Sequence, residues 1–139
     1  WRDLLAPPEG ARCAFVATDA GAGLVGCAWG GPEESGDPYY RAELLGLYLL
    51  APYRRRGLGR GLVSAVAARL RRQGHAALLL WALAANHPAR HFYEALGGRV
   101  LRERTIALRG FPVAEVAYAW PDIRTLIDPA APAAPPTPR

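Results

Sequence analysis

The sequence predicts an α/β (α+β) fold: a mixed, mostly antiparallel sheet with one central parallel strand pair and flanking helices. Two apolar, strand-like runs lie on either side of an amphipathic stretch of helical period, which is the order of a parallel crossover. Short apolar runs separated by glycine-containing turns occur before and after this unit and predict antiparallel hairpins. A length of 139 residues with 51% hydrophobic residues suits a single globular domain.

The first half of the chain supplies the strands before the crossover. Apolar runs at 14–18 and 24–29 are separated by the glycine-containing segment 21–23, which predicts a hairpin. Residues 30–37 are polar and contain glycine and proline, so we expect a loop. Residues 43–50 (ELLGLYLL) are apolar enough for a strand at the centre of the sheet.

The crossover itself is an amphipathic helix followed by a second central strand. Apolar side chains recur every four residues, at Leu58, Leu62, Val66 and Leu70. This spacing predicts a helix with one buried face, ending at Gln73-Gly74 where glycine can adopt the left-handed cap conformation. Residues 77–82 (ALLLWA) follow as the second central strand.

The remaining elements are a short helix and a closing hairpin. Pro88 suits the first turn of a helix, which we expect to run to about Leu96 and to end at the following two glycines. Residues 100–108 and 113–120 predict two strands joined around Arg109-Gly110.

The two ends of the chain differ from the middle. Five of the last twelve residues are proline, and we expect a Pro/Ala-rich disordered tail over 124–139 after a single domain over 1–123. The chain opens at Trp1 without a methionine, and residues 1–5 resemble the end of a helix.

Basic charge is concentrated in one stretch. Residues 41–72 hold eight arginines against one acid, Glu43, a net charge of +7, while the whole chain carries +5. A local patch argues against a general coat for nucleic acid or membranes, so neither is expected as a partner. The longest uninterrupted apolar stretch, 76–85, has ten residues and is too short to span a bilayer.

Cysteine and histidine usage predicts neither a disulfide framework nor a metal site. Cys13 and Cys27 are expected as small buried hydrophobes in a reducing cytoplasm, because no secretion signal opens the chain. The three histidines share no ligand spacing with either cysteine, so no metal is expected.

The segment 54–61 (RRRGLGRG) has the properties of a phosphate-binding site. It lies between a predicted strand and a predicted helix, where glycines let the backbone approach an anion and the first helical N–H groups point outward. Arginines beside it can bind further phosphates through two nitrogens at once. The Walker pattern is absent, and the dinucleotide pattern fails because Leu62 stands where its third glycine belongs.

Two motifs together resemble those of the GCN5-related N-acetyltransferase (GNAT) family. Leu47-Tyr48-Leu49-x-x-Pro52-x-Arg54-x-x-Gly57-x-Gly59-Arg60 resembles its acetyl-CoA-binding motif. Asn86-x-x-Ala89-x-x-Phe92-Tyr93-x-x-Leu96-Gly97 resembles a second motif at the expected distance. The resemblance covers about residues 12–120. It implies an N-terminally truncated member, with the family's first strand and helices largely missing.

The resemblance implies how acetyl-CoA would be bound. The strand over 43–50 would carry a bulge and splay from the strand over 77–82, with the pantetheine arm in the resulting V. Backbone groups of Leu47 and Leu49 would bond the arm and the thioester, and the loop 54–59 would wrap the pyrophosphate. The implied binding residues are Leu47, Tyr48, Leu49, Arg54, Arg55, Arg56, Gly57, Leu58, Gly59, Arg60, Asn86, Phe92 and Tyr93.

The implied activity is transfer of the acetyl group to a primary amine by direct attack in a ternary complex. An alkylamine has a pKa of about 10.4, so a base must take its proton at neutral pH, and Glu43 is the candidate. Tyr93 is the candidate acid or hydrogen-bond donor for the leaving sulfur. Members that act on protein N-termini can carry a glutamate where this chain has Trp81, which makes a peptide N-terminus a less favoured acceptor.

Each candidate residue also has a simpler interpretation. Glu43 could be a surface charge at a strand end, Tyr93 could be core packing, and Asn86 could only cap its helix. Arg55 and Arg56 could form a solvated face. Alternative functions are a non-catalytic acyl-CoA-binding module and, less favoured, a basic nucleic-acid-binding domain. The sequence does not decide whether the acceptor is a small-molecule or a peptide amine. A homodimer is possible.

Overall fold

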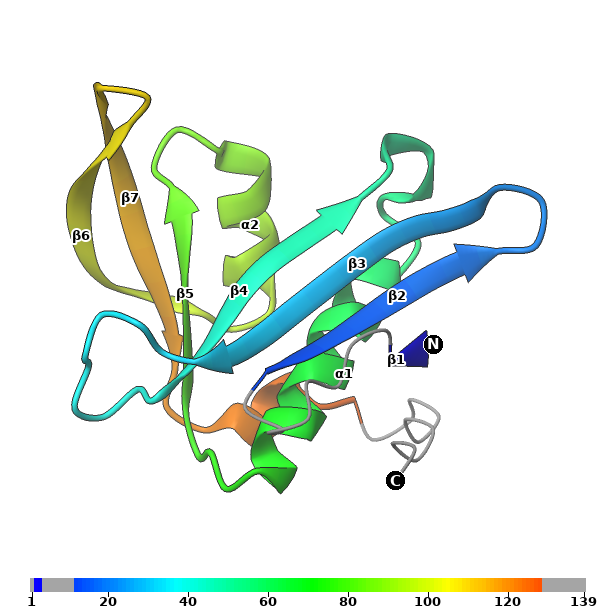
Figure 1. The fold of residues 1–139 in the computed structure, drawn as a ribbon, viewed down its shortest axis with the longest axis horizontal. Helices are drawn as coiled ribbons and strands as arrows, with labels where there is room; N and C mark the ends of the chain where they lie inside the picture. Colours follow the sequence, from blue (N-terminus) through cyan, green and yellow to red (C-terminus); the bar gives the residue numbers. More distant parts are fainter. Residues whose placement is uncertain (1, 4–11, 129–139) are drawn as a thin grey trace.

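A computed structural model describes residues 2–3 and 12–128 and contains one seven-stranded sheet with the strand order β1-β2-β3-β4-β5-β7-β6 (Figure 1). The strands are β1 (Arg2–Asp3), β2 (Cys13–Asp19), β3 (Gly23–Pro32), β4 (Ala42–Leu49), β5 (Leu78–Leu83), β6 (Arg99–Leu108) and β7 (Phe111–Trp120). The helices are α1 (Leu58–Arg72) and α2 (His87–Ala95), with 3-10 turns η1 (Ala51–Tyr53) and η2 (Ile123–Leu126). The predicted mixed sheet with flanking helices is confirmed.

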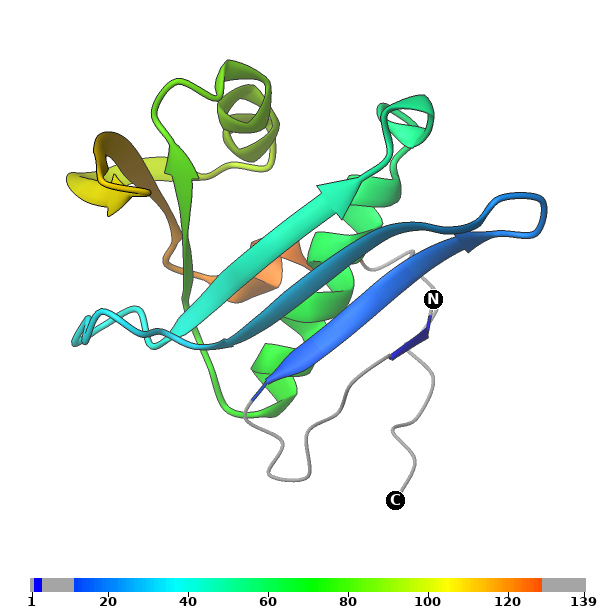
Figure 2. The same cartoon turned by 45° about the horizontal axis from the view of Figure 1, so that its top comes forward.

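The two central parallel strands, β4 and β5, pair with each other over only a short stretch. Their register contains only two residue pairs, Ala42 with Leu78 and Glu43 with Leu79. All other neighbouring strands pair antiparallel, and β5 pairs with β7 over its whole length. Beyond Glu43 the two strands diverge toward their carboxyl ends (Figures 1 and 2). The predicted splayed pair is therefore present.

A bulge in β4 accompanies this divergence. Trp29 of β3 lies opposite Gly46, but the next residue, Gly30, lies opposite Leu44, so Leu45 is an extra residue on β4. A bulge bends its strand and increases the local twist. The distortion begins two residues beyond the last pair with β5 and turns β4 away from it, as the family resemblance implied.

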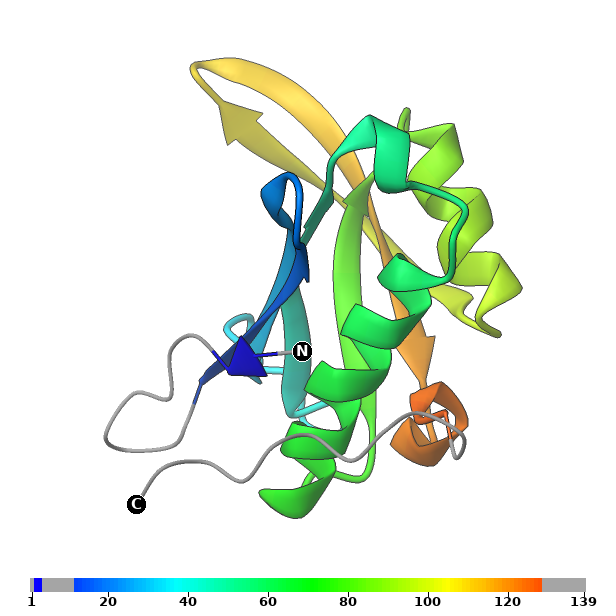
Figure 3. The ribbon, with the colours of Figure 1, turned by 90° about the vertical axis from the view of Figure 1, so that its right-hand side faces the viewer.

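Both helices cover the same face of the sheet (Figure 3). Three apolar residues of the predicted amphipathic face of α1, Leu62, Val66 and Leu70, are 0% exposed, and they share one core cluster with Tyr93 of α2. Burying this face, rather than helix propensity, supplies most of the stability of such a helix. In the described residues no helix is both long and apolar enough to cross a membrane.

Three sequence-based boundaries were wrong. The loop expected over 30–37 begins later, because β3 continues to Pro32 and pairs there with Ala42. Arg2–Asp3 is a strand paired with β2 and not the end of a helix.

The tail expected from residue 124 also begins too early. The 3-10 turn η2 buries Leu126, and the backbone N–H of Asp128 donates to Ser64 Oγ on α1 at 2.9 Å. Residues 124–128 therefore pack against α1 as part of the domain. The remainder of the predicted tail, 129–139, lies outside the described residues.

Gly30 permits the close approach of β3 and α1, and it provides a test of this packing. A Cβ atom at Gly30 would lie 2.7 Å from Val66 Cγ1 and 3.0 Å from the Glu43 carbonyl oxygen. We expect Gly30→Ala to lower the free energy of unfolding by about 1–3 kcal/mol, because neither neighbour can move freely. Urea unfolding measures this. Gly21→Ala, whose Cβ would meet nothing closer than 3.8 Å, is the control, and equal stabilities for the two variants would contradict the prediction.

Candidate functional site

The segment after β4 is anchored at its beginning by a series of hydrogen bonds. Leu50 N donates to the Val25 carbonyl at 2.9 Å, and Tyr53 N donates to the Leu50 carbonyl at 2.9 Å, closing the turn η1. Arg54 is held twice, since its N–H donates to the Ala51 carbonyl at 3.2 Å and its Nε donates to the Leu49 carbonyl at 3.2 Å. The chain therefore leaves β4 along a defined path.

The following residues turn the chain into α1, and their backbone N–H groups lack acceptors among the described residues. Arg55 and Gly57 have φ values of 63° and 80°, in the left-handed region. The first backbone bond of α1 joins Gly61 N to the Gly57 carbonyl at 3.0 Å. The N–H groups of residues 58–60 precede it and have no acceptor among the described residues. Together with the helix dipole, these N–H groups make the start of α1 chemically suited to an anion.

Arginines surround this site without being neutralised. Arg55, Arg56 and Arg60 are exposed, and none takes part in an ion pair within the described residues. Arg60 lies in the first turn of α1, which contains no acidic residue. A cation is unfavourable at this positive end of a helix dipole, so the folding of α1 does not account for Arg60.

The start of α2 approaches the start of α1. Asn86 caps α2, because its Oδ1 accepts the N–H of Ala89 at 3.2 Å, which confirms the simpler interpretation of that residue without excluding a second role. A Cβ at Gly59 of α1 would lie 3.3 Å from Phe92 Cζ of α2. The glycine therefore lets the two predicted motifs meet behind the gap between β4 and β5.

Tyr93 contributes its ring to the core and leaves its hydroxyl without a protein partner in the described structure. The ring centroid lies 5.4 Å from that of Phe92, 6.0 Å from Tyr118 and 6.4 Å from Trp120. The packing interpretation is thus correct for the ring. Burial raises the pKa of the Tyr93 hydroxyl to about 12, so the hydroxyl stays protonated at neutral pH.

Tyr118 of β7 fixes α2 against the sheet. Its hydroxyl accepts Arg90 Nε at 3.0 Å and donates to Glu94 Oε2 at 2.5 Å, while Arg90 Nη1 donates to the Ala84 carbonyl at 3.0 Å. Sequence reasoning missed this network. The four-residue spacing of Arg90 and Glu94 places both on one helix face and was the available signal.

Glu43 lies on the face of the sheet opposite the two helices. Its neighbours Ala42 and Leu44 point into the core cluster, so by strand alternation Glu43 points the other way. It is half-buried, and this burial raises the pKa of its carboxyl above the ordinary value of 4.5. A fully solvated surface charge would not show this shift. Its position is the last pair before β4 and β5 diverge.

A second set of residues on the helix-free face was not predicted. The Arg104 guanidinium lies 3.8 Å from the centroid of the Trp81 ring and its Nε donates to Glu115 Oε1 at 2.9 Å. Trp81 Nε1 is buried and has no hydrogen-bond partner among the described residues. Trp81 lies on β5 two residues beyond the last pair with β4, so this buried, unsatisfied N–H lies near the start of the gap.

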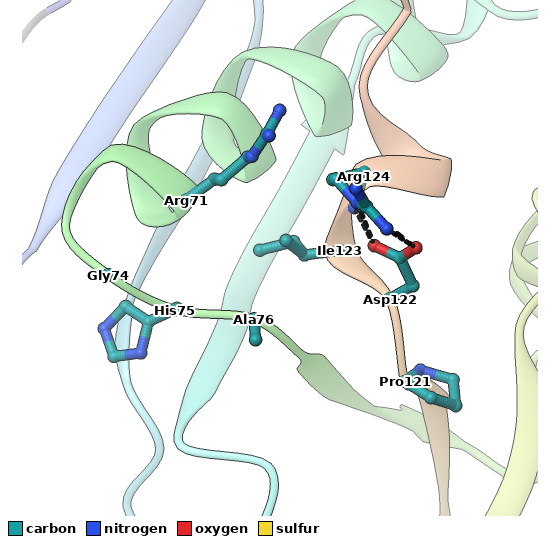
Figure 4. A pocket seen from close by; sticks show the side chains of 8 residues that line it. All are labelled: Arg71, Gly74, His75, Ala76, Pro121, Asp122, Ile123 and Arg124. Atoms are coloured by element: carbon teal, nitrogen blue, oxygen red, sulfur yellow. Dashed lines mark hydrogen bonds and ion pairs between the residues drawn. The ribbon is translucent and has the colours of Figure 1, made fainter.

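Two surface hollows, by contrast, lie at the far end of α1. One, of about 400 Å³, is lined by Arg71, Gly74, His75, Ala76 and residues 121–124, and its Asp122 and Arg124 pair with each other (Figure 4). The other, of about 330 Å³, is lined by His75, Arg41 and the loop after β3. Neither contains a residue of the two predicted motifs, so we do not assign the site to them.

The structure brings the two predicted motifs into contact at Gly59 and Phe92. Residues 54–60 follow β4, which carries Leu47, Tyr48 and Leu49, and Asn86, Phe92 and Tyr93 follow β5, so both segments come after the ends at which the two strands diverge. Glu43 marks the narrow end of the gap.

Comparison with known proteins agrees with this arrangement. The family model described as Acetyltransferase (GNAT) family matches residues 1–98. Comparison with the curated proteins gave no match.

Several solved structures share the fold. Nourseothricin acetyltransferase is 21% identical with a TM-score of 0.69, over 81% of this chain and 66% of that one. An N-acetyltransferase from Staphylococcus aureus is 18% identical with a TM-score of 0.67, over 83% and 70%. Arabidopsis thaliana NAA60 in complex with acetyl-CoA is 16% identical with a TM-score of 0.64, over 80% and 76%. With a family model matching more than half of its length, the chain belongs to the Acetyltransferase (GNAT) family.

Proposed function

We propose that this protein transfers the acetyl group of acetyl-CoA to a primary amine. The observation that carries the proposal is the gap between β4 and β5, which opens after two residue pairs toward the exposed N–H groups at the start of α1. A ligand with a phosphate group at one end and an amide-containing arm can occupy both features at once.

The arm of acetyl-CoA fits the unpaired edge of β4. After Glu43, the edge of β4 that faces β5 has no strand partner in the described structure, while the other edge pairs with β3 as far as Leu49. Backbone N–H and C=O groups on such an edge need partners. The amides of the pantetheine arm supply them, and the pyrophosphate then lies at residues 55–60.

The gap also explains how two candidate groups on opposite faces can act on one thioester. Glu43 lies on the helix-free face, and Tyr93 lies on the face covered by helices. A thioester placed in the gap is open to attack from the first face while its sulfur is directed toward the second. The amine nitrogen bonds to the carbonyl carbon, Glu43 takes the proton that the nitrogen loses, and the carbon–sulfur bond breaks.

Tyr93 then stabilises the leaving sulfur by a hydrogen bond. Its pKa of about 12 exceeds that of an ordinary thiol by about 3.5 units, so full proton transfer to the thiolate is uphill by about 5 kcal/mol. A donated hydrogen bond needs no such transfer, and the thiolate takes its proton from water after release.

The acceptor is a small-molecule or peptide amine that reaches the helix-free face. The structures that share the fold include nourseothricin acetyltransferase, whose name supports a small-molecule acceptor. A nucleic-acid-binding function is disfavoured, because such a site needs aromatic side chains between its arginines for base stacking. Segment 54–60 contains no aromatic residue. Tyr53, directly before it, donates its hydroxyl to Asp19 at 2.7 Å.

Arg60 allows a direct test of the phosphate site. We expect Arg60→Gln to weaken CoA binding about three- to tenfold and to reduce its salt dependence, while leaving stability equal or higher, because the cation opposes the helix dipole. Calorimetric titration with CoA and thermal unfolding measure the two effects. Arg72→Gln makes the same charge change at the other end of α1 and should leave CoA binding unchanged. Equal losses in both variants would contradict the assignment.

Tyr93→Phe separates catalysis from packing. The change keeps the ring contacts and removes a hydroxyl without a protein partner, so we expect unchanged stability and CoA affinity. Turnover should fall on the order of 10²-fold if the hydroxyl stabilises the sulfur in the transition state. The rate of thiol release under saturating substrates measures turnover. Undiminished turnover would show that Tyr93 serves only in core packing.

Glu43→Gln tests the base through its pH dependence. Burial raises the pKa of Glu43, so wild-type activity should fall as the pH is lowered, with a midpoint above the ordinary carboxyl value of 4.5. The variant should lose this acidic limb of the pH profile together with most of its turnover.

The folding stability of the wild type should depend on pH in the opposite direction to its activity. The folded protein binds the Glu43 proton more tightly than the unfolded chain, so wild-type stability falls as pH rises through the window above 4.5, and the glutamine variant escapes this loss. Glu103→Gln, an exposed acid on β6, is the control. An unchanged acidic limb in Glu43→Gln would show that another group or a water chain is the base.

A further inference from the structure

The β2–β3 hairpin is bonded to the segment that leads into the phosphate site. The Tyr53 hydroxyl of η1 donates to Asp19 Oδ2 at 2.7 Å, across 34 positions of sequence. The other carboxylate oxygen, Oδ1, accepts the N–H of Gly21 at 2.9 Å and so closes the hairpin turn. One carboxylate therefore joins two loops that no backbone ladder connects.

Tyr53 lies at the point where backbone anchoring stops. Arg54 N is the last backbone donor bonded to the chain before Gly61, within the described residues. The N–H groups of residues 55–60 have no backbone acceptor among the described residues, and the Gly57 carbonyl is the first to accept a bond, from Gly61 N. The Tyr53 ring also lies beneath the Arg56 guanidinium, 5.4 Å from its central carbon. Tyr53 thus directly precedes the residues whose N–H groups lack acceptors, and its ring contacts one of their arginines.

We propose that Asp19 is a positioning residue for the donor site: by holding Tyr53, it orients Arg56 and the backbone of 55–60 toward the diphosphate of acetyl-CoA. This inference rests on the proposed function. Asp19 itself touches no reacting atom, and its effect passes through the ring that it holds.

A purely electrostatic role and a positioning role for Asp19 predict opposite changes in CoA affinity when the residue is substituted. Asp19 is an acid close to Arg56, and as a charge alone it weakens the attraction of this region for phosphate. Removing the charge would then tighten CoA binding. If Asp19 acts by position, removing it weakens CoA binding in spite of the gain in positive charge. The hydrogen bond from Tyr53 lowers the pKa of Asp19, which keeps the carboxylate ionised at neutral pH.

The test compares Asp19→Asn, Tyr53→Phe and the double variant with the wild type. We expect the dissociation constant for CoA and the KM for acetyl-CoA to rise about three- to tenfold in each single variant, with kcat nearly unchanged. The double variant should resemble either single one, because both changes remove the same bond. With acetyl-pantetheine, which lacks the diphosphate, all variants should match the wild type.

Asp122→Asn is the matched control. Asp122 is also a turn-closing acid with a lowered pKa, held by Arg124 at the far end of α1, and its loss should leave CoA binding unchanged. Thermal unfolding verifies that each variant is folded.

Three results would overturn the inference. CoA binding by Asp19→Asn that equals or exceeds that of the wild type would show that charge, not position, is what Asp19 contributes. An equal loss with acetyl-pantetheine would show a general structural defect. A folded wild-type protein that does not bind CoA would overturn the proposed function and this inference with it, whereas the first two results leave the proposed function standing.

Discussion

The early end of the pairing between β4 and β5 is the constraint on which the rest of the structure depends. After Glu43, the bulge at Leu45 turns β4 toward β3, while β5 stays paired with β7. Within the described part of the chain, both strands then carry backbone edges without a strand partner in the middle of the sheet. Such edges are costly in a closed structure and useful at a site, because a ligand with its own amides can satisfy them. The gap also connects the two faces of the sheet.

The helices determine what meets at that gap. The α1 helix starts where β4 ends and α2 starts where β5 ends, so both helix N-termini lie at the open end of the V. Tyr118 fixes α2 to β7 through Arg90 and Glu94, and Gly59 lets Phe92 approach α1. Packing on one face thereby places the Tyr93 ring, while the described residues put no helix on the other face.

Electrostatics divide the site into two regions. The start of α1 is positive, with exposed arginines and N–H groups that lack acceptors, and the helix-free face holds the half-buried carboxyl of Glu43. On that face the two nearby arginines are neutralised, Arg102 by Asp37 at 2.6 Å and Arg104 by Glu115 at 2.9 Å. In the proposed reaction, this separation would direct an anionic donor and an amine to different sides of the same gap.

The sequence by itself determined the elements and the phosphate segment, because periodicity, glycines and charge are local properties. The predicted strands and helices match the structure within a few residues, and segment 54–61 stands at the start of α1 as expected. The divergence of β4 from β5 followed only from the family resemblance. Only the tertiary structure decided the bond of Tyr53 to Asp19, the contact of Arg104 with Trp81 and the packing of 124–128 on α1. These join residues far apart in the chain, and their partners depend on strand register and helix placement, which local patterns do not encode.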